Sequence, residues 1–114
     1  METDIIWITI PSVTKRELYK IEFSQDALKD LAWFRKSEQT EIRDGIDESL
    51  RYDPNIETRN RKKLRPNRTA EWELRIGRFR VFYDVDRVVR IASVEAIGLK
   101  EGNVVLFQGK EEEL

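Results

Sequence analysis

A run of alternating residues around one glycine constrains this chain more than any other part of its sequence. In WELRIGRFRVFYDV (72–85), apolar and polar side chains largely alternate on both sides of Gly77-Arg78. Such alternation is typical of strands with one buried face, and glycine supplies the positive φ of a two-residue hairpin turn. The sequence therefore predicts a hairpin. Its expected cross-strand pairs are Ile76–Phe79, Arg75–Arg80, Leu74–Val81 and Trp72–Tyr83.

The same register divides the side chains between two faces. The face toward the helices should hold Trp72, Leu74, Ile76, Phe79, Val81, Tyr83 and Val85, and the other face should carry Glu71, Glu73, Arg75, Arg80, Phe82 and Asp84. Like charges placed directly opposite each other repel. A phosphate between Arg75 and Arg80 would relieve that repulsion, because its oxygens match guanidinium geometry. In the alternative interpretation, the acidic residues of this face neutralise the arginines in a surface network.

The net charge of −1 hides an uneven distribution. Between Arg59 and Arg80, nine lysines and arginines accompany two glutamates, a balance of +7, and the rest of the chain has a balance of −8. A basic segment of this kind attracts polyanions or an acidic protein. Together with an exposed aromatic ring expected at Phe82, it predicts a surface for RNA backbone and a stacked base. The candidate RNA-binding residues are Arg61, Lys62, Lys63, Arg65, Arg68, Arg78 and Phe82.

The other segments predict an α+β domain, with two N-terminal helices packed on one face of a mainly antiparallel, twisted sheet. Ser24 is a candidate N-cap for the first helix, and Ile42, Ile46 and Leu50 form one apolar stripe on the second. The expected elements are strands at 17–24, 71–76, 79–85, 88–97 and 104–107, helices at 25–36 and 38–52, and a long basic loop at 54–70. The leading segment DIIWITI (4–10) is apolar on both faces. It predicts an added edge strand, with a partner-binding arm as the alternative.

Composition excludes several kinds of site. The chain has no histidine and no cysteine, which excludes imidazole-based acid–base catalysis, thiolate metal sites and disulfides. No apolar run reaches the roughly 18 residues of a membrane span. The start of the chain lacks the basic region and cleavage site of a signal peptide. We expect one soluble, intracellular domain without a metal or a cofactor.

Three stretches of the chain resemble the RelE/ParE family of toxins from type II toxin–antitoxin modules. They are YKIEFSQDALKDL, WELRIGRFRVFYDVD, and VEAIGLKEGN with the terminal GKEEEL. The resemblance covers about residues 17–114 and leaves 1–16 as an extension. It implies a microbial-ribonuclease-like fold, a cytoplasmic location in a prokaryote and a cognate antitoxin that wraps the toxin. RelE-like members cleave mRNA in the ribosomal A site, whereas ParE-like members inhibit DNA gyrase.

The resemblance also implies roles for individual residues. Arg80 matches the phosphate-binding strand arginine of the family, Arg75 another common basic position, and Lys100 the basic residue after the last long strand. The chain departs from the RelE-like nucleases at four positions. Glu71 and Glu73 replace lysines, Leu99 replaces a basic residue or histidine, and Leu106 stands at the position of a C-terminal tyrosine.

Two functional hypotheses follow. In the first, the chain is a toxin that binds RNA and, if active, cleaves ribosome-bound mRNA, with Arg75, Arg80 and Lys100 as its catalytic residues. Its general base is left open among Glu73, Asp84 and Glu95. In the second, it is a non-catalytic binding protein, either a ParE-like gyrase inhibitor or a degenerate toxin that mainly binds its antitoxin. A metabolic or structural domain of similar fold is the least favoured interpretation. The sequence also leaves open whether METDIIWITI (1–10) mediates a homodimer.

Overall fold

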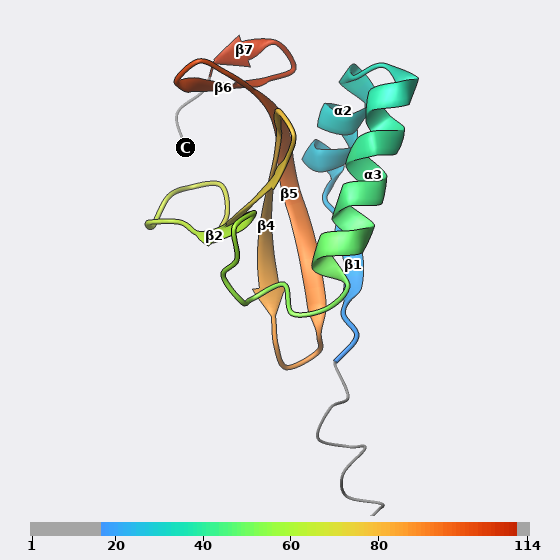
Figure 1. The fold of residues 1–114 in the computed structure, drawn as a ribbon, viewed down its shortest axis with the longest axis vertical. Helices are drawn as coiled ribbons and strands as arrows, with labels where there is room; N and C mark the ends of the chain where they lie inside the picture. Colours follow the sequence, from blue (N-terminus) through green and yellow to red (C-terminus); the bar gives the residue numbers. More distant parts are fainter. Residues whose placement is uncertain (1–16, 112–114) are drawn as a thin grey trace, which may run out of the picture.

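The computed structural model describes residues 17–111, which form two helices packed on one face of a seven-stranded sheet (Figure 1). The sheet has the order β2-β3-β4-β5-β6-β7, and β1 pairs with β5. All of these pairs are antiparallel except β1 with β5. The predicted α+β architecture is therefore confirmed. The elements are β1 (Lys20–Phe23), α2 (Gln25–Trp33), α3 (Lys36–Leu50), β2 (Arg61–Lys63), β3 (Trp72–Ile76), β4 (Phe79–Asp86), β5 (Ile91–Glu101), β6 (Val104–Phe107) and β7 (Lys110–Glu111).

Helix α2 starts where the sequence predicts. The Ser24 side chain accepts a hydrogen bond from the Ala27 amide at 3.0 Å, which satisfies a donor of the first helical turn. The helix ends at Trp33, earlier than expected, because Phe34 adopts extended backbone (φ −80°, ψ 161°). This conformation accompanies the burial of the Phe34 ring, which packs edge-on against Phe79 with ring centroids 5.3 Å apart. Core packing thus ends the helix.

Helix α3 is positioned by one stripe of side chains. Ile42, Ile46 and Leu50 recur every four residues, and all three are buried, as the spacing predicts. The helix begins and ends two residues before the predicted bounds of 38 and 52. At its start, Glu38 accepts a hydrogen bond from the Arg35 amide at 3.1 Å. Together α2 and α3 cover the apolar face of the central strands (Figure 1).

The structure differs from the sequence prediction at the start of one strand and in two additional short strands. The expected strand at 88–97 starts only at Ile91, because the Asp86 side chain accepts hydrogen bonds from the amides of Val88 and Val89 and closes a turn. Both valines are exposed. The expected loop at 54–70 contains the short strand β2, which pairs with β3, and β7 follows β6 without having been predicted. The edge strand expected at 4–10 lies outside the described residues.

One buried carboxylate completes the edge of β5. This strand pairs with β1 through Val94 and with β6 from Leu99, which leaves a gap between the two neighbours. Asp30 of α2, 6% exposed, occupies the gap. Its Oδ2 accepts a hydrogen bond from the Ile97 amide at 2.9 Å, and its Oδ1 accepts one from Gln108 Nε2 at 2.8 Å. A helix side chain therefore replaces a strand where the sheet has none.

Replacing this carboxylate tests its structural role. Asp30→Ala leaves the buried Ile97 amide without its acceptor, so we expect the free energy of unfolding to fall by about 2–3 kcal/mol. Lys29→Ala changes the adjacent exposed residue of the same helix and should cost less than about 0.5 kcal/mol. Urea denaturation of the two variants measures their free energies of unfolding. Equal urea midpoints for Asp30→Ala and Lys29→Ala would contradict the structural role of the Asp30 carboxylate.

Candidate nucleic-acid interface

The hairpin of β3 and β4 has the register predicted from its alternation. Gly77 has a φ of 56°, in the region that favours glycine, and forms the two-residue turn with Arg78. Ile76 pairs with Phe79 and Arg75 with Arg80, and the register continues to Trp72 opposite Tyr83. The arginine pair therefore lies one step from the turn, on the face opposite the helices.

We call this surface of β3, β4 and β5 the arginine face, defined by Arg75, Arg80 and Lys100. Gly98 of β5 pairs with Arg80 and continues the row begun by Arg75, and Lys100, two residues farther along β5, lies on the same face. A Cβ at Gly98 would lie 2.6 Å from Val105 Cγ1 and 2.9 Å from the Leu106 carbonyl oxygen. Glycine is therefore required here for β6 to approach β5.

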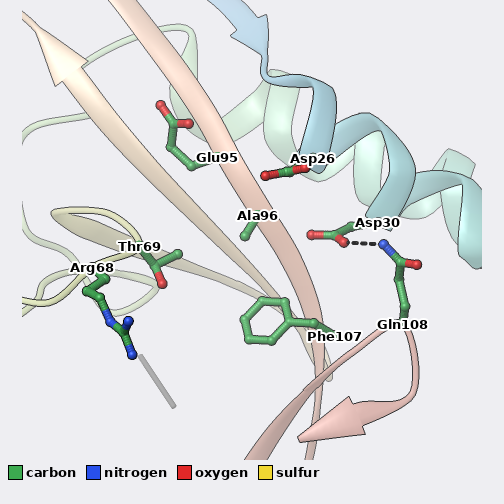
Figure 2. A pocket seen from close by; sticks show the side chains of 8 residues that line it. All are labelled: Asp26, Asp30, Arg68, Thr69, Glu95, Ala96, Phe107 and Gln108. Atoms are coloured by element: carbon green, nitrogen blue, oxygen red, sulfur yellow. Dashed lines mark hydrogen bonds between the residues drawn. The ribbon is translucent and has the colours of Figure 1, made fainter. Parts of the chain in front are cut away.

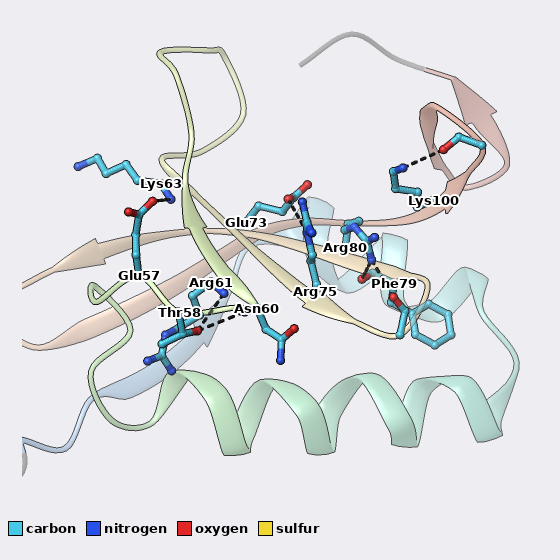
Figure 3. A network of polar contacts seen from close by, with 12 residues as sticks. Glu57, Thr58, Asn60, Arg61, Lys63, Glu73, Arg75, Phe79, Arg80 and Lys100 are labelled. Atoms are coloured by element: carbon cyan, nitrogen blue, oxygen red, sulfur yellow. Dashed lines mark hydrogen bonds and ion pairs between the residues drawn. The ribbon is translucent and has the colours of Figure 1, made fainter.

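The arginine pair is only partly neutralised. Glu73 Oε1 lies 3.5 Å from Arg75 Nε (Figure 3). Arg80 instead donates from Nη1 to the carbonyl oxygens of Gly77 at 2.8 Å and Phe79 at 3.0 Å. Burial lowers the pKa of Arg80; the charge of Glu73 opposes this shift and that of Arg75 adds to it. One carboxylate thus serves two guanidinium groups, and the pair keeps a net positive charge.

The other two acidic residues expected on this face have a different role. Asp84 Oδ1 accepts a hydrogen bond from the Glu71 amide at 2.8 Å, which joins the start of β3 to β4. Within residues 17–111, neither Glu71 nor Asp84 forms an ion pair with an arginine. The acidic network proposed as the alternative interpretation is therefore reduced to Glu73.

Lys100 lies inside β5, because this strand continues to Glu101 rather than ending at 97. Its amide donates to the Arg78 carbonyl oxygen at 2.9 Å, which ties the strand to the arginine turn. Its Nζ donates to the Gly102 carbonyl oxygen at 2.8 Å (Figure 3). The ammonium group is thus held toward the turn that follows β5.

The expectation that Phe82 is an exposed ring is wrong. Phe82 is fully buried, and its ring centroid lies 5.6 Å from that of Phe107 in β6. Strand β6 brings Phe107 over this part of the sheet and removes the Phe82 ring from solvent. A stacking role for Phe82 would require β6 to move away. No sequence pattern near Phe82 indicates this contact, which joins residues 25 positions apart.

The basic segment divides into structural and exposed cations. Arg61 donates from Nη1 to the Ser49 carbonyl oxygen at 2.8 Å, which fixes the loop to α3, and Lys63 Nζ lies 5.7 Å from the centroid of the Trp72 ring. Lys62 pairs with Glu73 and therefore lies on the side of the arginine face. The exposed cations of the segment are Arg59, Lys62, Lys63, Arg65, Arg68, Arg75 and Arg78.

Asn67, which the sequence analysis did not single out, shapes this basic segment. Its side-chain amide donates to the carbonyl oxygens of Arg65 and Ala70, and its Oδ1 accepts from the amides of Thr69 and Ala70. These four bonds close a compact turn that presents Arg65 and Arg68. Asparagine after proline is a signal for such a turn, and it could have been recognised as one.

A β-bulge places Glu95 in an acidic pocket beside the arginine face. Phe82 pairs with Ala96 but Tyr83 pairs with Val94, so Glu95 is the extra residue of β5. Glu95 lines a pocket with Asp26 and Asp30 of α2, and Arg68 lies across it (Figure 2). Burial raises the pKa of the Glu95 carboxyl, and the charges of Asp84 and Asp26 raise it further. The three carboxylates of this pocket would repel an anion that approached the arginine face from that side.

Comparison with solved structures identifies the fold. The chain is similar to a chain of the toxin–antitoxin complex RelBE2 from Mycobacterium tuberculosis, with a TM-score of 0.65, 18% identity, and coverage of 75% of this chain and 98% of that one. It is also similar to a chain of the archaeal RelE–RelB complex from Pyrococcus horikoshii OT3, with a TM-score of 0.59, 18% identity, and coverage of 76% and 99%. The fold is RelE-like. No family model and no curated protein sequence matches the chain.

In this RelE-like fold, no tyrosine lies on the arginine face. Tyr19 and Tyr83 are buried, and the Tyr83 hydroxyl donates to the Pro54 carbonyl oxygen at 2.7 Å. Burial raises the pKa of Tyr83, against the opposing charge of Arg61. Tyr52 follows α3 and pairs with Leu18. These are the three tyrosines of the chain, so the tyrosine that the family resemblance implies has no counterpart on this surface.

The described part of the chain offers neither a metal site nor a membrane span. Residues 17–111 contain no group of three His, Cys, Asp or Glu side chains arranged to hold a metal ion. None of their helices is long and apolar enough to cross a bilayer.

The raised pKa of Glu95 predicts a pH-dependent contribution to stability. A carboxyl whose pKa is raised by folding binds its proton more tightly in the native state, so ionisation at higher pH destabilises the fold. Glu95→Gln cannot ionise and should be more stable than the unmodified chain at pH 7. The advantage should shrink as pH falls through the raised pKa and disappear below the ordinary value of 4.5. Urea denaturation at several pH values measures the free energy of unfolding of both proteins. If the difference between them did not vary with pH, ionisation of Glu95 would not be its cause.

Proposed function

We propose that this chain is the cytoplasmic toxin of a type II toxin–antitoxin module and that it binds RNA through the arginine face. The observation that carries the proposal is the cross-strand pair of Arg75 and Arg80 on the exposed side of the hairpin. The RelE-like fold supports it, because the two similar structures are toxin–antitoxin complexes. On the same basis, we propose a RelB-like antitoxin as the protein partner.

The hydrogen bonds of Arg80 suit it to bind phosphate. Its Nη1 donates to two backbone carbonyl oxygens, which fixes the plane of the guanidinium group. A guanidinium group has five N–H donors, so those on Nε and Nη2 remain for a ligand. Arg75 lies opposite and can donate to the same anion. A phosphate there replaces the repulsion between two like charges with charge-assisted hydrogen bonds.

Glu73 regulates the strength of this site. Its carboxylate contacts Arg75 and reduces the repulsion between the two arginines while no anion is bound. A phosphate that approaches Arg75 competes with Glu73 for the same donors, which weakens the net attraction. The remaining affinity for RNA therefore depends on the flanking cations. Each of them that contacts an RNA phosphate releases counterions from it, which favours binding. These flanking residues are Lys62, Arg65, Arg68, Arg78 and Lys100.

Cleavage of ribosome-bound mRNA is the more specific form of the proposal. Arg75, Arg80 and Lys100 would stabilise the negative charge that develops as the 2′-hydroxyl attacks the phosphorus. The step also needs a group that accepts the 2′-hydroxyl proton and one that protonates the leaving 5′-oxygen. The chain has no histidine, and its tyrosines lie elsewhere. Glu73, the carboxylate in contact with the pair, is the proposed proton acceptor. Once protonated, it would return the proton through water to the leaving 5′-oxygen, so that the step balances.

A non-catalytic toxin is the second candidate function. Two observations favour it: Glu73 is engaged in an ion pair, and the Phe82 ring is covered by Phe107. In this form the arginine face binds its partner without cutting RNA. Growth arrest would then come from inhibition of DNA gyrase. Alternatively, the chain is a degenerate toxin that acts mainly by binding its antitoxin. The two candidates share the arginine face, but they differ in whether it cuts RNA and in which partner it acts on.

Salt dependence tests whether Arg80 contacts the RNA backbone. For single strands, each phosphate contact adds about 0.7 to the slope of log affinity against log salt concentration. Arg80→Gln should therefore weaken binding of a labelled single-stranded RNA and lower this slope by about 0.7. Arg87→Gln removes an exposed arginine in the turn after β4, at the end of this strand far from Arg80, and should leave the slope unchanged. Fluorescence anisotropy measures both, and equal slopes for the two variants would contradict the contact.

Growth after induced expression tests the toxin itself. Expression of the unmodified chain should arrest growth, and Arg80→Glu should abolish the arrest, because it places a negative charge opposite Arg75. Arg87→Glu makes the same change of charge away from the arginine face and should stay toxic. Circular dichroism confirms that each variant is folded. A folded, fully toxic Arg80→Glu variant would contradict the role of the arginine face.

Primer extension on translated mRNA separates the two candidate functions. Cuts at positions set by the codon register would establish the nuclease. Growth arrest with inhibited DNA supercoiling and no cuts would instead establish the gyrase inhibitor.

A further inference from the structure

One edge of β1 has no strand beside it within residues 17–111. The amides of Lys20 and Ser24 donate to the Arg90 and Val94 carbonyl oxygens, both at 2.9 Å, so the even-numbered residues face β5. Backbone groups alternate in direction along a strand. The amides and carbonyl oxygens of Ile21 and Phe23 therefore point to the opposite edge. An edge of this kind is a template for pairing with another extended segment.

A groove runs along this edge, between β1 and α3. Ile21 and Phe23 are half-buried and form its apolar side together with Ile46 of α3, while charged side chains of α3 form the rim. Figure 1 shows β1 beside the last turns of α3, at the border of the sheet. The groove thus combines unpaired backbone with apolar side chains, which are the two features by which a sheet binds an added strand. Its lining residues are Lys20, Ile21, Phe23, Arg43, Asp44, Ile46, Asp47 and Arg51.

We propose that residues 4–10 of this chain, DIIWITI, bind in this groove as a strand antiparallel to β1. Five of the seven residues are isoleucine or tryptophan, which are enriched in strands. Because apolar residues occur at odd and even positions, either register presents apolar side chains to Ile21 and Phe23. Pro11 follows the segment, where its missing amide costs no ladder hydrogen bond. The six residues 11–16 reach about 20 Å when extended, which is ample for a hairpin connection.

Charge supports the antiparallel direction. Tyr52, just after α3, pairs with Leu18, so the end of α3 lies near the start of β1. Arg43, two turns earlier in α3, lies toward the Phe23 end of the groove, and it forms no ion pair with any residue from 17 to 111. An antiparallel segment brings Asp4 to that end, beside Arg43. A parallel segment would place Asp4 at the opposite end, where the cations Lys20 and Arg51 already pair with Glu22 and Asp47.

Amide hydrogen exchange in the full chain, followed by NMR, tests the added strand. The amides of Ile21 and Phe23 should be protected, since the segment accepts hydrogen bonds from them. An Ile6→Pro/Ile8→Pro double variant should exchange both amides about ten-fold faster or more, because proline cannot take part in the ladder. Val13→Pro, in the connection, should leave the exchange unchanged. The Ile97 amide, bound to Asp30, reports whether each variant is folded.

Three results would overturn the proposal. The first is unprotected exchange of Ile21 and Phe23 in the unmodified chain. The second is protection that persists in the Ile6→Pro/Ile8→Pro variant, which would mean that another group covers the edge. The third is protection that rises with protein concentration alongside a dimer in light scattering, which would mean that the segment comes from a second copy.

Discussion

The two-residue turn at Gly77-Arg78 sets the register of β3 against β4, and the core and the arginine face both depend on that register. Because side chains alternate along a strand, a shift of one residue would expose Trp72 and Leu74 and bury the arginines. Burying two unpaired like charges is far more costly than exposing apolar side chains. The core therefore holds Arg75 and Arg80 opposite each other despite their repulsion. The repulsion is small beside the burial that fixes the register, and it is the physical basis of the proposed phosphate site.

Neighbouring side chains and contacts from other strands decide what this surface can do. Glu73, in the same strand as Arg75, limits its positive charge. Gly98 lets β6 approach, and Phe107 of β6 covers the Phe82 ring. The result is a surface suited to phosphate but without an exposed aromatic ring among its central residues. Backbone binding is consequently better supported than base recognition. Catalysis would rest on a carboxylate that already contacts one of the arginines.

Local patterns in the sequence were enough to predict the hairpin register, the Ser24 cap and the Ile42–Leu50 stripe, because each depends on residues close together in the chain. The errors have two causes. At Val88 and Val89 two local signals compete: the valines favour a strand, yet the Asp86 side chain closes a turn over them. At Phe82 a distant segment decides the outcome. Phe82 lies on the predicted face, but a residue 25 positions away buries it. The assigned roles of Arg75, Arg80 and Lys100 remain predictions, although the structure places all three on one face.

NMR of the arginine side chains tests the phosphate site most directly. Titration of the ¹⁵N-labelled chain with a short single-stranded RNA would be followed through the Nε–H resonances, assigned with Arg→Lys variants. We expect the Arg75 and Arg80 signals to shift together and to saturate at the same RNA concentration, while Arg87 stays unchanged. Shifts confined to arginines outside the face, with Arg75 and Arg80 unaffected, would contradict the account.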